Sequence, residues 1–422
     1  MKNRIAILLV ALFAALSGMA YSGQTIRVIA STHSFTDSMQ RLLEEFDRET
    51  GIKAALDVYG DEQASQKMLV ELTAQSDAMD VFMIRPLQDQ RMFHRNGWME
   101  DLTPYFQGDT DYDFEDFNEA ARKATNINGF QCTIPAQAEC EVLFYRKDLF
   151  EAKGLKPPEN FEELEEAARI LTDRENDMYG FVSRGARSAL ITMFSSFLYG
   201  FGADWVDEKG NSAVHTPPFI AAIDLYARLL REYGPPGAPN ISWAQSVAIF
   251  GQGKVAMYTD VSTTFPNILD RTKSAVADKT GVMLFPAGPA GRRISYIVPM
   301  GLGISRFSRN KDAAWKYIRF MTNKKNSLRI QGEWANATSR ISAYQTPEGV
   351  AAFPKDFAAA ISEAGKYGVD HDRPQVIAVQ EARDFIGEAV VAAIEGKDYI
   401  PAAKIASQRF QTIIDREKTG SK

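Results

Sequence analysis

Strand and helix patterns alternate along the first part of this 422-residue chain. This alternation is the sequence feature that most restricts which folds the chain can adopt. Residues 25–30 (TIRVIA) predict a short strand. In residues 34–50 the apolar side chains recur at helical spacing, with charged residues on the opposite face. Two further strands, over 52–59 (IKAALDVY) and 80–84 (DVFMI), flank a helix expected over 66–74. Such alternation is typical of an α/β fold with a largely parallel sheet.

The alternation of strand and helix patterns begins again after about residue 130 and continues to the C-terminus. A strand is expected over 141–145 and another over 255–258, and Asn160 is the expected N-cap of a helix over 161–171. Further helices are expected over 148–152, 218–233, 246–252, 310–321, 378–395 and 401–415. A chain of this length exceeds what one hydrophobic core usually supports, so two or three domains are expected.

The N-terminus has the pattern of a secretory signal peptide. Lys2 and Arg4 precede an apolar run over 5–16, and small residues follow at 17–20. The run is shorter than the roughly 20 residues that a membrane-spanning helix needs. The alternative is that this apolar run forms a buried core helix. Charged residues before the run and small residues after it are not typical of such a helix. We therefore expect cleavage of residues 1–22 and a periplasmic mature protein, without a lipid anchor because no Cys follows the run.

The overall charge restricts the partners of the chain. The formal net charge is −6 at neutral pH, which argues against nucleic acid and against adsorption to an anionic membrane. No second apolar run approaches spanning length. The expected partner is therefore a small molecule or another protein.

The two cysteines, Cys132 and Cys140, are candidates for a disulfide, because a close even pair in an oxidising compartment favours one. Closing so short a loop would stabilise the fold by about 2–3 kcal/mol. The alternative is two separate thiols. The histidines lie far apart in the sequence, which gives no support to a metal site.

Motifs for catalysis or cofactor binding do not emerge from the sequence. There is no phosphate-binding loop, no strand-linked dinucleotide fingerprint, no nucleophile elbow and no zinc-binding helix pair. The acidic run over 109–116 begins like a calcium loop, but Phe114 stands where Gly is needed and Ala120 where Glu is needed. We expect no cofactor, no metal and no catalytic residue.

Tryptophans in polar, loop-like contexts are more informative. Trp205 (GADWVDEKGN) and Trp243 (NISWAQ) could each supply a flat surface for the C–H face of a sugar or polyol, whose hydroxyls need polar groups around the rim. For each the alternative is a packed core anchor. Trp98 and Trp315 lie in apolar helical contexts and are assigned to packing.

Several segments, in a fixed order, resemble the extracellular solute-binding proteins of ABC importers, family 1, which include the maltose-binding protein. The segments are FDRETGIKAALDVY, SDAMDVFMI, NGWMEDLTPYF, ECEVLFYRKDLFEAKGLKPPENFEELEEAARILTD, GFGADWVDEKGNSAVHTPPFIAAIDLYARLL, ISWAQSVAIFGQGKVAMYTD and SRNKDAAWKYIRFMTNKKNSLRI. Two features depart from the family: Val298–Gly301 replaces a Gly-Gly-Trp-like segment, and the cysteine pair is not general.

The resemblance implies a two-lobe α/β periplasmic binding protein of the type II-like kind, with discontinuous lobes joined by hinge strands. Lobe one would hold 24–135 plus 262–308, and lobe two 136–261 plus 309–422. The hinge would lie near Cys132 and Cys140. A ligand would bind between the lobes, which close over it by hinge motion.

The resemblance also implies which residues line the cleft. From lobe one it assigns to the ligand His33, Ser34, Tyr59, Gln63, Arg85, Asp260 and Met300. From lobe two it assigns Gln137, Glu141, Trp205, Trp243 and Arg340. Each has a structural alternative: Arg85, for example, could pair with a surface carboxylate.

The function implied is capture of a carbohydrate or sugar alcohol by a monomeric, non-enzymatic protein that delivers it to the permease subunits of an ABC transporter. Other solutes stay open, namely an oligosaccharide, a glycerol phosphate or a polyamine, and Arg85 and Arg340 could serve an anionic group. The rival from another class is a secreted glycan hydrolase. The hydrolase hypothesis requires a pair of carboxylates in the cleft, one of them with a raised pKa.

Overall fold

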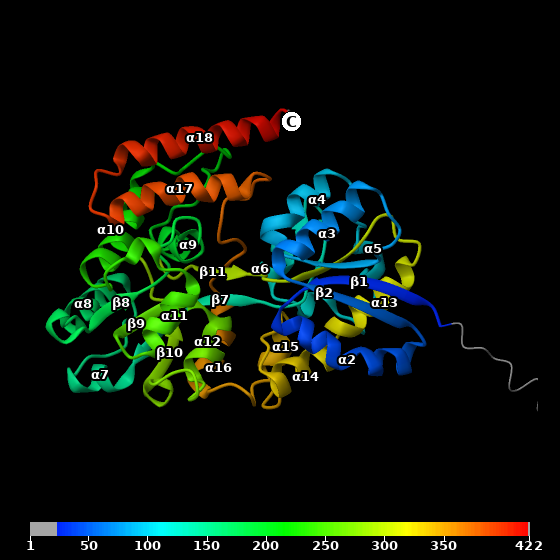
Figure 1. The fold of residues 1–422 in the computed structure, drawn as a ribbon, viewed down its shortest axis with the longest axis horizontal. Coiled ribbons are helices and arrows are strands. Elements are labelled where there is room, and N and C mark those ends of the chain that lie inside the picture. Colours follow the sequence, from blue (N-terminus) through cyan, green and yellow to red (C-terminus); the bar gives the residue numbers. More distant parts are fainter. Residues whose placement is uncertain (1–22, 421–422) are drawn as a thin grey trace, which may run out of the picture.

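Two α/β lobes lie side by side in the computed structural model, which describes residues 23–420 (Figure 1). The expected signal peptide, residues 1–22, lies outside the described residues. Within 23–420, no helix is both long and apolar enough to cross a membrane.

Lobe one is built on a five-stranded sheet of order β2-β1-β3-β12-β6. Strand β1 pairs in parallel with β2 and β3, while β12 runs antiparallel to β3 and β6. Its elements are β1 (Thr25–Ser31), α2 (Ser34–Thr50), β2 (Lys53–Tyr59), α3 (Asp61–Thr73), β3 (Val81–Ile84), a π-helical turn η1 (Pro86–Gln90), α4 (Arg91–Arg95), α5 (Thr103–Phe106), the hairpin β4 (Asn126–Ile127) and β5 (Phe130–Gln131), β6 (Ile134–Pro135), β12 (Gly301–Ile304), α13 (Lys311–Thr322) and α14 (Lys324–Trp334).

Helix α2 shows how the local sequence sets these elements. Its apolar face, which includes Phe35 and Met39, is buried against the sheet. The ring of His33 accepts a hydrogen bond from the backbone N–H of Phe35 at 3.3 Å and so caps the N-terminus. Gly51 ends the helix in the left-handed conformation, with φ of 70°. The bounds are those expected from the sequence, 34–50.

Lobe two is built on a six-stranded sheet in which β10 lies beside β7 and the other strands follow the order β13-β11-β7-β9-β8. Its elements are α6 (Glu119–Ala124), β7 (Glu139–Arg146), α7 (Lys147–Ala152), α8 (Phe161–Leu171), β8 (Tyr179–Val182), α9 (Leu190–Gly200), α10 (Pro217–Glu232), α11 (Trp243–Gly251), β9 (Val255–Val261), α12 (Phe265–Leu269), β10 (Thr280–Leu284), β11 (Ile294–Ile297), α15 (Ile341–Tyr344), α16 (Lys355–Ala364), β13 (Gly368–Val369), α17 (Val379–Ile394) and α18 (Ile400–Lys418).

The membership of the two cores corrects the expected division of the chain. Helices α13 and α14 pack with β1 and α2 in lobe one, although 309–334 was expected in lobe two. Strands β10 and β11 pair with β7, so most of 262–297 belongs to lobe two, not lobe one. Helix α6 also packs against the core of lobe two. Apart from the passage to and from α6, the chain crosses between the lobes near 135–139, 297–301 and 334–341.

The expected disulfide is absent, and the alternative of two thiols holds. Cys132 is buried in a cluster of lobe one that includes Phe82, whereas Cys140 is buried on β7 in the core of lobe two. The two side chains therefore serve as small apolar groups in separate cores. Burial raises the pKa of both thiols to about 12, which leaves them protonated and unreactive.

Candidate functional site

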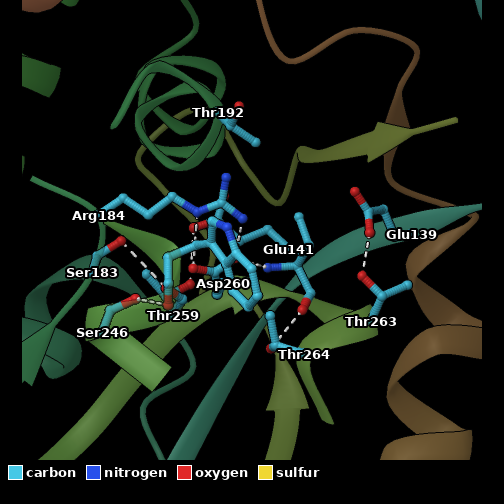
Figure 2. A network of polar contacts seen from close by, with 12 residues as sticks. Glu139, Glu141, Ser183, Arg184, Thr192, Ser246, Thr259, Asp260, Thr263 and Thr264 are labelled. Carbon is cyan, nitrogen blue, oxygen red and sulfur yellow. Dashed lines mark hydrogen bonds and ion pairs between the residues drawn. The ribbon is translucent and has the colours of Figure 1, made fainter. Parts of the chain in front are cut away.

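A network of charged and hydroxyl side chains lies where three strands of lobe two end or begin (Figure 2). Arg184 follows β8, Asp260 lies near the end of β9, and Glu139 and Glu141 lie at the start of β7. Strand β9 pairs with both β7 and β8, and the register places Asp260 opposite Val142. The sheet therefore brings these four side chains together from distant parts of the sequence.

Arg184 and Asp260 form the central ion pair of this network. Arg184 Nε donates to Asp260 Oδ2 at 3.0 Å, and Nη2 donates to Oδ1. Asp260 is fully buried, and its Oδ1 also accepts from the backbone N–H of Val261 at 2.8 Å. Burial opposes the charge of Arg184, but Asp260 more than offsets it, so the pKa of the guanidinium is raised.

The two glutamates beside this ion pair differ in their exposure and in their hydrogen bonds. Burial raises the pKa of Glu139 to about 7, although its carboxylate accepts a hydrogen bond from the hydroxyl of Thr263. Glu141 is fully buried, and burial raises its pKa well above the usual value. Its Oε1 accepts from Thr259 Oγ1 at 2.8 Å, while Oε2 has no partner in the described structure. Of the two glutamates, Glu139 is therefore the one that is partly exposed and has a pKa near neutral pH.

A second ion pair reaches toward lobe one from the segment after β13. Arg373 donates from Nη2 to Asp372 Oδ2 at 2.6 Å, and from Nη1 to Gln88 Oε1 on η1 of lobe one at 3.3 Å. Asp372 is fully buried, and although burial opposes its charge, Arg373 lowers its pKa to about 2. The ion pair thus lies at the contact between the lobes.

Arg383, on α17, contributes a further guanidinium near the contact between the lobes. Its Nη2 and Nε donate to the carbonyl oxygen of Ser188 at 2.7 and 3.1 Å. Burial, and next the charge of Arg373, lower its pKa to about 9. Arg85 of lobe one also contributes to this lowering, which shows that it faces the same region. Leu87, two residues later, packs against the core of lobe two.

On lobe one, predicted residues gather at the carboxyl ends of β1 and β2. Tyr59 is paired with Ser31 in the register, and the side chain of His33 caps α2 beside them. Ser34 and Gln63 are exposed in the same region. Burial lowers the pKa of His33, so the ring is neutral at pH 7. The role of these residues as ligand contacts stays a prediction.

Two residues expected at the ligand are instead structural. Trp205 is 1% exposed, packs against Phe194 and Phe219, and donates from Nε1 to the hydroxyl of Tyr199 at 3.1 Å. Met300 is buried in the core of lobe one. The expectation that Trp205 and Met300 present their side chains to a solute is therefore wrong.

Arg340 is also structural. It is fully buried, and its guanidinium lies 4.0 Å from the ring centre of Phe117. It donates to the carbonyl oxygens of Thr322 at 2.7 Å and Tyr112 at 2.9 Å, and it pairs with Asp116 at 3.2 Å. These contacts engage all three nitrogens of the guanidinium, so the expected role in the cleft is wrong. Arg340 instead fixes the crossing near 334–341 to lobe one.

The remaining predicted residues have mixed surroundings. Glu141 and Asp260 belong to the network, with Asp260 on lobe two and not lobe one as expected. Arg85 lies at the contact between lobes, with Nε 3.6 Å from Asp89 Oδ2. Gln137 is fully buried at the hinge, and neither atom of its amide has a partner in the described structure. Trp243 is 50% exposed at the start of α11.

The sequence interpretation missed Arg184, Glu139, Arg373 and Arg383. Arg184 carried a usable signal, because it lies two residues after the apolar run 179–182, which forms a buried strand. The other three carried none, since their positions depend on contacts between distant segments. In residues 23–420 no group of three or more His, Cys, Asp or Glu side chains could hold a metal ion.

Comparison with known proteins decides the family. A model of the bacterial extracellular solute-binding protein family matches residues 32–327. The chain belongs to this family. The match runs from α2 into α14 and so includes most strands of both sheets, with β1 and β13 outside it.

Particular members of this solute-binding family resemble the chain over most of their length. The mannitol-binding protein of Pseudomonas aeruginosa is 27% identical over 77% of this chain and 74% of its own. The erythritol/L-threitol-binding protein of Mycolicibacterium smegmatis is 28% identical over 72% of this chain and 68% of its own. An ABC transporter solute-binding protein from Agrobacterium radiobacter K84, solved in complex with ribitol, has a TM-score of 0.80 and 25% identity, and covers 92% of this chain and 98% of its own.

Proposed function

We propose that this protein captures an uncharged acyclic polyol between its lobes and delivers it to the membrane permease of an ABC importer. The similar proteins are named for, or were solved with, erythritol, ribitol and mannitol, which are linear polyols of increasing length. The site proposed here is the network around Arg184 and Asp260, with Arg85 and the residues at the ends of β1 and β2 contributing from lobe one.

The observation that carries the proposal is the matching of guanidinium and carboxylate groups. Asp260 neutralises Arg184, and Asp372 neutralises Arg373. Each hydroxyl of a polyol both donates and accepts a hydrogen bond, and neighbouring carboxylate and guanidinium groups meet both needs. Because the charges cancel within each pair, the network suits a neutral polyhydroxy ligand better than a strongly charged solute.

Capture requires that the lobes close. Ligand contacts that exist only in the closed form drive closure, because binding shifts an equilibrium by its differential affinity for the two states. Arg373, held by Asp372 and bonded to Gln88, lies where the lobes meet and would report that movement. We further propose that the mature protein is periplasmic after removal of residues 1–22, carries no lipid anchor and acts as a monomer.

The carboxyl groups of the network do not favour a glycan hydrolase. Such an enzyme needs two carboxyl groups that face the scissile bond. Asp260 and Asp372 are fully buried in ion pairs, and Glu141 is fully buried beneath Thr259. Glu139 combines a raised pKa with partial exposure, as does Asp89 on η1, whose carboxylate is paired with Arg85. Steady release of product from aryl glycosides would nevertheless remove the binding-protein proposal.

Calorimetric titration tests the proposed ligand class. We expect erythritol, ribitol or mannitol to bind, and maltose, glycerol 3-phosphate and spermidine not to. Arg184→Met should abolish polyol binding. The matched control is Arg228→Met, which breaks a pair with Glu165 on the surface and should leave binding unchanged. Binding of only a phosphate ester, a polyamine or an oligosaccharide would contradict the proposal.

A further inference from the structure

A pocket of about 530 Å³ lies on lobe two beside helix α6, and no residue of the proposed polyol site lines it. Its walls come from α6, from the segment after α9, from the residues before β11, and from the end of α16 through β13. Helix α6 packs beside β11, near the middle of the molecule in Figure 1. We call this hollow the basic pocket, because cationic side chains outnumber anionic ones in its walls.

The parallel pairing of β11 and β13 brings cationic residues together at one end of the two strands. Ile294, the first residue of β11, pairs with Gly368, the first residue of β13. Arg292 and Lys366 each lie two residues before this pair, and both line the basic pocket. Arg293, the residue between Arg292 and β11, lines it as well. Two segments that are about 70 residues apart in the sequence therefore supply three cations to one hollow.

The carboxylates in the walls of the basic pocket already have cationic partners there. The ring of His371 lies between two of them, with Nε2 2.9 Å from Asp204 Oδ1 and Nδ1 2.8 Å from Asp370 Oδ1. Burial lowers the pKa of His371, but the two carboxylates outweigh burial and raise it to about 9, so the ring is charged at pH 7. Glu119 pairs with Lys123 at 2.6 Å on the exposed face of α6.

Three cations of the basic pocket have no carboxylate partner among the described residues, namely Arg292, Arg293 and Lys366. With five cationic and three anionic side chains in all, the walls carry a surplus of two positive charges at pH 7. The whole chain has a formal net charge of −6, so this surplus is a local feature of the surface. A concave site with an excess of one sign of charge concentrates ligands of the opposite sign.

The two guanidinium groups of the basic pocket are held over different aromatic rings. Arg292 lies 5.7 Å from the centre of the Tyr367 ring, and its Nη2 donates to the carbonyl oxygen of Glu159 at 3.2 Å. Arg293 lies 5.7 Å from the centre of the Tyr199 ring. Contact with the face of a ring favours one position of the guanidinium. The pocket therefore offers two separate binding points for oxyanions.

We propose that the basic pocket binds a small dicarboxylate, with one carboxylate at Arg292 and Lys366 and the other at Arg293. Guanidinium groups bind carboxylates through paired N–H donors, and these charge-assisted hydrogen bonds are among the stronger ones in proteins. The two charges of a dicarboxylate match the surplus in the walls, and their separation suits cations that are held over different rings. A phosphate group carries its charges on a single centre and would leave one of the two binding points unused.

Succinate, a linear four-carbon dicarboxylate, is the probe, and calorimetric titration at low salt measures its binding. We expect succinate to bind, and acetate and inorganic phosphate to bind at least about tenfold more weakly, because each can use only one of the two binding points. Raising the salt concentration should weaken succinate binding, since exposed charges are screened. Phosphate that binds as tightly as succinate would overturn the dicarboxylate assignment, and the absence of succinate binding would overturn the site.

Two variants locate the succinate in the basic pocket. Arg293→Met and Lys366→Met each remove one exposed cation from the walls, and each should weaken succinate binding at least about tenfold with a native melting temperature. The matched control is Arg306→Met, which removes an exposed arginine after β12 of lobe one, outside the walls, and should leave succinate affinity unchanged. An equal effect of all three substitutions, or an effect of none, would overturn the proposed site.

The basic pocket and the polyol site are tested separately. Succinate titrations contain no polyol, so they decide the basic pocket even if no polyol binds and the proposed function fails. Arg293→Met should keep the native affinity for mannitol, because Arg293 lies outside the polar network. Displacement of succinate by mannitol would place succinate between the lobes and overturn the basic pocket, while leaving the polyol proposal intact.

Discussion

Arg184 and Asp260 meet at two points: Nε donates to Oδ2 at 3.0 Å, and Nη2 donates to Oδ1. They come from the segments after β8 and at the end of β9, and Asp260 has no exposed surface. Removing one partner of such a pair leaves an uncompensated charge in a buried place. The pair is therefore both a structural tie between neighbouring strands and the centre of the proposed polyol site.

Asp260→Asn should lower the free energy of unfolding by about 3 kcal/mol and abolish polyol binding, because Arg184 loses its counter-charge. Urea unfolding and calorimetry measure the two effects. The control is Asp57→Asn, which breaks the half-exposed pair with Arg27 and should cost less than about 1 kcal/mol. A stable Asp260→Asn variant that still binds the polyol would show that the pair is peripheral to the site.

Glu139 should make polyol affinity depend on pH near neutrality. Its pKa is raised to about 7, chiefly by burial, so the carboxyl gains a charge as pH rises from 6 to 8. An ionised carboxylate is the stronger acceptor for a hydroxyl, and affinity should rise across this interval. Glu139→Gln should remove the dependence. Calorimetric titrations at several pH values check this, and a native profile that is flat would exclude contact between Glu139 and the ligand.

Arg340 should be essential for stability and dispensable for binding. It is fully buried and donates to three backbone carbonyls of lobe one, so Arg340→Met should reduce the free energy of unfolding by about 3 kcal/mol or more. The control is Arg309→Met, which removes an 84%-exposed guanidinium paired with Asp77. In the temperature range where Arg340→Met stays folded, calorimetry should give native polyol affinity. Lost affinity with native stability would return Arg340 to the ligand site.

The elements that the sequence predicted well carry their signals locally. The helix over 34–50 has one apolar face and a glycine C-cap, and the helix over 161–171 has Asn160 as its cap, which accepts from the N–H of Glu163 at 2.9 Å. Helix α9, Leu190–Gly200, was not predicted. Every one of its residues is buried, so no side of the helix carries charged residues and its sequence shows no contrast between a polar and an apolar face.

Features that depend on distant contacts could not be predicted. The division into lobes was partly wrong because α13 and α14 follow a crossing that no local pattern marks. Arg340 was expected at the ligand because it lies in TSRISAY, where the resemblance placed a cleft-facing loop. Its guanidinium instead donates to the carbonyl oxygen of Tyr112, which lies more than 200 residues earlier in the sequence. Asp372 and Arg373 are adjacent in sequence, and only the fold brings Arg373 to Gln88.

The two tryptophans expected at the ligand should separate into opposite classes. Trp205→Ala empties a core site and should cost about 3–5 kcal/mol of stability. Trp243→Ala removes a half-exposed ring at the start of α11 and should change the melting temperature little. If Trp243 stacks on the solute, its variant weakens polyol binding by calorimetry. Thermal melts without ligand check the first expectation, and native stability of Trp205→Ala would contradict it.

His371 should make stability fall at alkaline pH. Its ring lies between two carboxylates, with Nε2 2.9 Å from Asp204 Oδ1 and Nδ1 2.8 Å from Asp370 Oδ1. Burial lowers its pKa, but the two carboxylates outweigh burial and raise it from 6.5 to about 9. A raised pKa in the folded state stabilises the fold fully below pH 6.5, and this stabilisation is lost as pH rises through about 9.

The measurement is the melting temperature of the native protein and of His371→Gln between pH 6 and 9.5. The native protein should lose stability over this interval, and the variant should be less stable at pH 6 and nearly independent of pH above it. His215→Gln serves as the control, because it removes a histidine outside the pair of carboxylates and should keep the native slope. Parallel profiles for the native protein and His371→Gln would show that His371 is not charged in the folded state. Since the next residues are the ion pair of Asp372 and Arg373, loss of the charge on His371 should also weaken polyol binding at alkaline pH, and calorimetry at pH 7 and 9.5 tests that consequence.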